Sequence, residues 1–109
     1  MTSTYEYQLS MWAPQRQQRA EMGDVLETPR LVEHFAYFSR RSQAQAAADD
    51  LITAGFEVAR ARRGLKTVLK ATRTEALGDD QVARFLREVV DIVERHRGDY
   101  DGWGATVEA

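Results

Sequence analysis

The segment covering residues 80–96 limits the possible folds more than any other part of the chain. Its apolar side chains recur at helical spacing, which predicts one long amphipathic helix that Asp79 caps and Gly98 ends. They are Val82, Phe85, Leu86, Val89, Ile92 and Val93. Such a stripe must be buried against another layer, and a chain of 109 residues can build one two-layer core and little more.

The pattern of the remaining residues predicts that the other layer is a sheet. A second helix is expected over residues 43–54, with cap residues between Ser39 and Ser42 and with Gly55 just past its end. Strands are expected over residues 31–38, 56–63, 65–73 and 100–107, and Gly64 is placed in a hairpin turn. This order predicts a ferredoxin-like α+β fold over residues 30–109, a βαββαβ arrangement with a four-stranded antiparallel sheet and two helices on one face.

Residues 1–29 are expected to form an N-terminal arm. Four apolar residues there alternate with polar ones, which predicts a short strand. They are Tyr5, Tyr7, Leu9 and Met11. Pro14 suits the first turn of a helix, so a short polar helix is expected over residues 15–22, ended by Gly23. This helix is expected to pack through Trp12, Ala20 and Met22.

The composition excludes several classes of protein. The chain has no cysteine, so disulfides and cysteine metal ligands are excluded, and its two histidines lack metal-ligand spacing. The net charge of −2 gives no general attraction to nucleic acid or anionic lipid. No apolar run is long enough to span a membrane, and the first 15 residues do not resemble a secretory signal. We therefore expect a cytoplasmic protein that uses no cofactor and no metal.

The last part of the chain combines aromatic residues with glycines. Gly102 and Gly104 flank Trp103, and such glycines in a strand are tolerated where the strand bulges or where a backbone approaches closely. Asp99 and Asp101 are expected to point to solvent while Tyr100 points inward, because residues two apart share one face of a strand. Trp103 is interpreted as either a core residue or a binding residue.

Three stretches of the sequence resemble the regulator of ribonuclease E activity B family. Residues 30–38, RLVEHFAYF, resemble its opening strand, and residues 46–58 look like its first helix and second strand. Residues 100–104, YDGWG, are similar to its closing signature and are the most specific part of the likeness, which runs from about Gln15 to the C-terminus. The resemblance implies a ferredoxin-like domain that binds ribonuclease E and lowers its activity, without catalytic residues or a cofactor.

Positive charge is concentrated in the predicted hairpin. Residues 60–73 carry a formal charge of +6 and no acidic residue, so the rest of the chain carries −8. Strand alternation places Arg60 and Arg62 on the face of Val58, and Lys66 and Lys70 on the face of Val68. This hairpin could bind phosphates or an acidic partner, or it could simply keep an edge strand soluble.

These observations lead to a primary hypothesis and to alternatives. The primary hypothesis is a non-enzymatic regulatory module that binds a protein partner, either ribonuclease E or another cytosolic protein. Its candidate contact residues are His34, Tyr100, Asp101, Trp103, Arg60, Arg62, Lys66 and Lys70. One alternative is a small dimeric enzyme in which His34, Tyr37 and Trp103 line a pocket on the sheet.

A second alternative is a module that associates with nucleic acid through the basic hairpin. The first predicted strand offers Phe35, Tyr37 and Phe38 for base stacking, but the third offers no aromatic residue. Direct binding of nucleic acid through the sheet is therefore disfavoured. A homodimer remains open, because the aromatic arm could pair with the sheet edge of a second copy.

Overall fold

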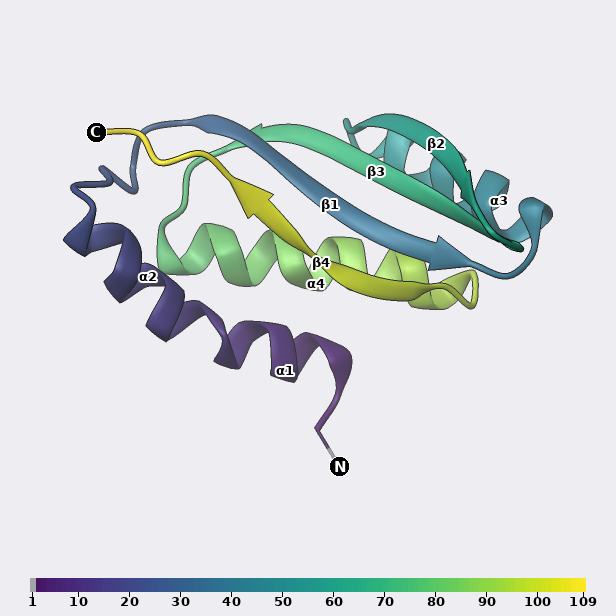
Figure 1. The fold of residues 1–109 in the computed structure, drawn as a ribbon, viewed down its shortest axis with the longest axis horizontal. Coiled ribbons are helices and arrows are strands. Elements are labelled where there is room, and N and C mark those ends of the chain that lie inside the picture. Colours follow the sequence, from purple (N-terminus) through teal and green to yellow (C-terminus); the bar gives the residue numbers. More distant parts are fainter. Residues whose placement is uncertain (1) are drawn as a thin grey trace.

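The computed structural model describes residues 2–109, so Met1, the first residue of the predicted arm, lies outside the described residues. Helices α1 and α2 come first, and six further elements follow in the order strand, helix, strand, strand, helix, strand. Their bounds are α1 Thr4–Ser10, α2 Trp12–Glu21, β1 Arg30–Phe38, α3 Arg41–Thr53, β2 Glu57–Arg63, β3 Lys66–Glu75, α4 Asp79–Arg95 and β4 Asp99–Ala105. In Figure 1, α4 runs along the sheet and the arm formed by α1 and α2 lies beyond α4.

The four strands form one antiparallel sheet in the order β2-β3-β1-β4. The long strands β1 and β3 are central, and Phe38 at the end of β1 pairs with Thr67 near the start of β3. Helices α3 and α4 pack against each other and against the sheet. The prediction of an α+β fold with a four-stranded antiparallel sheet is confirmed.

Side chains alternate strictly between the two faces of β1. Val32, His34, Ala36 and Phe38 are buried in the core that α3 and α4 cover. The intervening residues are partly or fully exposed on the opposite face, which we call the open face. In the described chain this face is uncovered, and it includes Phe35 and Tyr37 side by side with charged neighbours from β2, β3 and β4.

A β-bulge shapes the glycine-rich strand β4. Phe35 pairs with Gly102 and the next residue of β1 pairs with Tyr100, so Asp101 is the extra residue. Gly102 has a φ of 132°, which favours glycine at this position. Gly98, just before the strand, lies against the Phe38 ring, where an added Cβ would come within 2.4 Å of a ring carbon. Of the two reasons given for the glycines beside Trp103, the bulge is confirmed at Gly102, but an added Cβ would meet nothing within 4 Å at Gly102 or Gly104, so a close approach does not explain either of them.

The predicted strand in the N-terminal arm is wrong, because Thr4–Ser10 forms helix α1. Tyr5 and Leu9 are four residues apart, so a helix places both on the face that packs against the core. Tyr7 is 55% exposed on the other side, so the two-residue alternation does not correspond to a buried face. The Ser3 side chain accepts a hydrogen bond from the Glu6 amide and caps the helix.

Helix α2 exists but packs differently from the prediction. Trp12 is buried as expected, whereas Ala20 and Met22 are exposed, and the polar residue Arg19 is buried in their place. The predicted cap by Asp79 is also wrong, because α4 begins at Asp79 itself. Its carboxylate instead accepts hydrogen bonds from Trp12 Nε1 and Arg16, which fastens α2 to the start of α4.

Candidate functional site

The open face is an uncovered surface on which aromatic and charged side chains lie together. Phe35 and Tyr37 lie at its centre on β1, and Val68 lies beside them on β3. All three are partly exposed because no helix of the described chain packs over them. Together with Lys70, Asp101 and residues of β2 they line a shallow hollow of about 480 Å³.

Charge is distributed unequally across the open face. Arg63, Lys66 and Lys70 lie on the β2–β3 half, and Asp99 and Asp101 lie on β4. Lys66 Nζ is 4.0 Å from Asp99 Oδ2, and Lys70 Nζ is 3.4 Å from Glu33 Oε2. Because these pairs are exposed, they contribute little to stability, and their groups remain free to exchange partners. Glu57, at the start of β2, is the acidic exception on the basic half.

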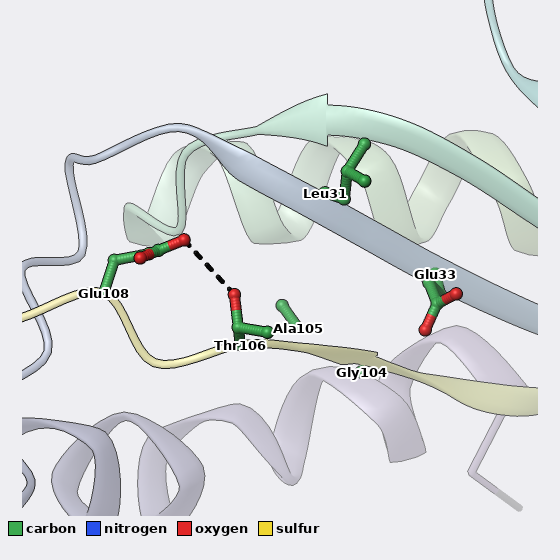
Figure 2. A pocket seen from close by; sticks show the side chains of 6 residues that line it. All are labelled: Leu31, Glu33, Gly104, Ala105, Thr106 and Glu108. Carbon is green, nitrogen blue, oxygen red and sulfur yellow. Dashed lines mark hydrogen bonds between the residues drawn. The ribbon is translucent and has the colours of Figure 1, made fainter.

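A second hollow extends the open face toward the C-terminus. It measures about 560 Å³ and is lined by Leu31 and Glu33 of β1 and by the end of β4 with the residues that follow it. Figure 2 shows Leu31 and Glu33 on β1, across from the hydrogen bond between Thr106 and Glu108. Leu31 is 62% exposed, so the face has an apolar side chain at this end as well.

The structure divides the candidate contact residues among different surfaces. Lys66, Lys70 and Asp101 lie on the open face, as strand alternation predicts for the two lysines. Arg60 points to the helix side of β2, where its guanidinium donates to the side chain of Gln45 on α3. Arg62 is two residues further along the same strand and shares that side. The predicted residues therefore do not form one patch.

His34 and Tyr100 are core residues in this structure. His34 is 2% exposed and Tyr100 is 8% exposed, and His34 Nδ1 is hydrogen-bonded to the Tyr100 hydroxyl at 2.8 Å. Burial, with a smaller contribution from the charge of Arg73, lowers the pKa of His34 to about 3, and burial raises the pKa of Tyr100. Neither side chain can touch a partner while the domain is folded, so the candidate contact surface is corrected to exclude both.

Trp103 lies on the same inner side and joins the arm to the domain. The centre of its ring is 5.0 Å from the centre of the Phe85 ring, in an edge-to-face arrangement, and 5.8 Å from the centre of the Trp12 ring. The guanidinium carbon of Arg19 is 5.9 Å from the centre of the Trp103 ring. Tyr37 lies on the open face, so His34, Tyr37 and Trp103 do not line one cavity. The pocket of the alternative enzyme hypothesis is therefore not present.

Two features escaped the sequence reasoning. Phe35 and Tyr37 were interpreted as residues for base stacking, and Tyr37 also as part of a pocket, although their alternation with buried neighbours marks them as outward-facing residues of a central strand. The other feature is a buried ionic cluster of Arg19, Asp24 and Arg30, which nothing in the local pattern marks.

The ionic cluster fixes the arm to one end of the sheet, where β1 begins and β4 ends. Arg30 Nη1 is 2.7 Å from Asp24 Oδ1 with both side chains fully buried, and Arg19 Nη1 is 3.0 Å from Asp24 Oδ2. Both arginines also donate to the carbonyl of Thr106 just beyond β4. Burial alone would raise the pKa of Asp24, but the hydrogen bonds from Arg30 and Arg19 outweigh it and lower the pKa. This cluster is structural, because it leaves no oxygen of Asp24 exposed.

No helix of the described residues is long and apolar enough to cross a membrane. Residues 2–109 also contain no group of three or more histidine or acidic side chains placed to hold a metal ion.

Comparison with known proteins gives one family. The family described as regulator of ribonuclease activity B matches residues 16–105, from the first half of α2 to the end of β4. No curated protein matches the chain. The matched range agrees with the extent of the resemblance found in the sequence, and α1 lies outside it.

Proposed function

Because this chain belongs to the regulator of ribonuclease activity B family, we propose that it is a non-enzymatic cytosolic regulator that binds a protein partner through the open face of its sheet. Ribonuclease E is the partner to test first. We also propose that residues 30–109 form a ferredoxin-like domain. The βαββαβ order of elements and the strand order β2-β3-β1-β4 support this assignment.

The observation that carries the proposal is the exposure of Phe35 and Tyr37 on a central strand. Aromatic residues dominate the binding energy of protein interfaces when a partner covers them, and charged residues around them set orientation and specificity. Here Lys70 and Asp101 flank the aromatic pair with opposite charges. A partner that presents an apolar centre with charges of both signs at its rim would complement this face.

A regulatory role without catalysis is supported by the position of the one strand histidine. His34 is the residue that an acid–base mechanism would use first, but it is buried and its pKa is lowered to about 3. At neutral pH it is therefore uncharged and out of contact with any substrate on the open face. The chain would act by occupying a surface of the partner.

Titration against purified ribonuclease E fragments tests the proposal. Tyr37→Ser should raise the dissociation constant about thirtyfold, because truncating a central aromatic residue in an interface costs about 2 kcal/mol. Tyr7→Ser is the matched control, since Tyr7 is an exposed tyrosine on α1, away from the sheet. Circular dichroism should show both variants folded.

Two results would contradict different parts of the proposal. If no fragment binds saturably, ribonuclease E is not the partner. If a fragment binds and Tyr37→Ser binds as well as the unmodified chain, the open face is not the binding surface. The same titration tests the charged residues around the aromatic pair. It compares charge reversal by Lys70→Glu with charge reversal by Arg84→Glu on the exposed side of α4.

A further inference from the structure

The arginines of this chain fall into two groups. One group is ion-paired, each member lying within 4.0 Å of an acidic side chain. Its members are Arg16, Arg19, Arg30, Arg73, Arg87 and Arg95. Within residues 2–109 the other group forms no such pair, and its members are Arg40, Arg41, Arg60, Arg62, Arg63, Arg84 and Arg97. Three of these, Arg41, Arg60 and Arg62, border one hollow. Cations left together without acidic partners can bind an external anion.

These three arginines meet at one corner of the fold. Arg62 on β2 is paired with Thr67 on β3, and Thr67 is paired with Phe38 at the end of β1. Helix α3 begins at Arg41, three residues after Phe38. The side chains of Arg41, Arg60 and Arg62 accordingly line a hollow of about 320 Å³ together with Thr67.

Thr67 adds a polar side chain to the wall of the hollow. The residue is 4% exposed and borders the hollow, and among residues 2–109 the buried polar side-chain atom without a hydrogen-bond partner is His34 Nε2, not the Thr67 hydroxyl. A hydroxyl at the wall of a hollow can donate one hydrogen bond to a ligand atom. The adjacent helix start adds to this. The residue before α3, Arg40, makes no side-chain capping bond, and the first turn contains no acidic residue.

We propose that Arg41, Arg60, Arg62 and Thr67 form a binding site for a phosphate group at the start of α3. A tetrahedral phosphate offers enough acceptor positions for several guanidinium groups and a hydroxyl at once, whereas one arginine satisfies a carboxylate with its paired donors. Gln45 already holds the Arg60 guanidinium, which reduces the ordering needed on binding.

The ligand is expected to be a compact phosphate group. The hollow is a single concavity at the edge of β2, and its three arginines border the same small space of about 320 Å³. The site lies mainly on the helix side of β2, although Arg60 also borders the hollow of the open face. The inference does not depend on the proposed partner, because phosphate binding is measured with the chain alone.

Nuclear magnetic resonance titration of the full chain with sodium phosphate, at ionic strength held constant with chloride, tests the proposal. We expect saturable shifts of the backbone amides of Arg41, Ser42 and Thr67. Arg62→Gln should weaken binding about tenfold, which corresponds to about 1.4 kcal/mol, because it removes one charge-assisted hydrogen bond to the phosphate. Thr67→Val, which keeps the shape of the side chain, should weaken it about fivefold.

The matched control is Arg63→Gln. Arg63 is adjacent to Arg62 and carries the same charge, but strand alternation turns it to the open face. Phosphate binding by this variant should stay within about twofold of the unmodified chain, because a screened charge that makes no contact contributes little. If Arg63→Gln weakens binding as much as Arg62→Gln, the effect is general electrostatics and the proposal fails.

Three further titrations identify the source of the phosphate. If adenosine monophosphate binds with the same affinity as inorganic phosphate, the result supports the site with a small phosphate ester as its ligand. A single-stranded RNA tetranucleotide that binds more tightly, and loses that gain in Arg62→Gln, supports the site with an RNA phosphate. No saturable phosphate binding overturns the proposal, and so does a glutamate peptide that binds these residues more tightly than any phosphate compound.

Discussion

Polar side chains on the two faces of β1 lie in opposite environments, although side chains alternate between these faces residue by residue along the strand. On the covered face, His34 is enclosed by aromatic rings and uncharged, and Arg30 at the strand start is in full contact with Asp24. On the open face, Glu33 keeps only a loose contact with Lys70, and both remain about half exposed. The covered face determines stability, and the open face is free to bind.

One ion pair on each face shows how strongly the two environments differ. The Arg30–Asp24 pair has fully buried side chains and a separation of 2.7 Å, whereas the Lys66–Asp99 pair has side chains that are 52% and 82% exposed and a separation of 4.0 Å. Solvent screens the second pair but cannot reach the first. The same kind of interaction should therefore have very different effects on the two faces.

The largest expected effect comes from Asp24→Asn. The change leaves Arg30 and Arg19 buried without a counter-charge, which should lower the free energy of unfolding by about 3–5 kcal/mol. Asp99→Asn on the open face should change it by less than about 1 kcal/mol. Urea unfolding of both variants checks this. Equal losses would show that the two faces do not differ in the way described.

The second largest effect is expected for Trp103→Ala. The side chain packs between Trp12 and Phe85, so its removal should lower the free energy of unfolding by about 3 kcal/mol and loosen the arm. Phe35→Ala on the open face should cost less, because its ring is already partly in solvent. Thermal unfolding compares the two. A stable Trp103→Ala variant with weakened partner binding would instead make Trp103 an interface residue.

Much of the domain could be predicted from the sequence because its patterns are long. The stripe of α4 and the alternation of β1 each extend over several repeats, and their bounds differ from prediction by one residue at most. The arm failed because Tyr5, Tyr7 and Leu9 fit both a strand and a short helix, and only contact with α4 selects the helix. Local patterns do not contain that contact.

The candidate site was predicted less well, for a different reason. Local alternation correctly separated Arg60 and Arg62 from Lys66 and Lys70, but it could not show which face the helices would cover. His34 and Tyr100 therefore seemed available although they face the core. In the buried cluster Asp24 lies only six residues before Arg30, but the carbonyl of Thr106 that Arg30 also contacts is 76 residues away. No spacing in the sequence brings these three residues together.

The last prediction concerns how the free energy of unfolding changes with pH, and it tests the contribution of His34. The pKa of His34 is lowered to about 3 in the folded chain and is 6.5 when unperturbed, so the unfolded chain binds a proton more readily. Its contribution to stability is complete above pH 6.5 and is lost as the pH falls from there toward 3, at up to about 1.4 kcal/mol per pH unit. His34→Leu should be less stable at neutral pH, because Tyr100 loses its hydrogen bond, but its stability should decline less steeply between these limits. Urea unfolding at a series of pH values gives both slopes, and parallel curves would mean that His34 gains a proton in the folded chain as easily as in the unfolded one.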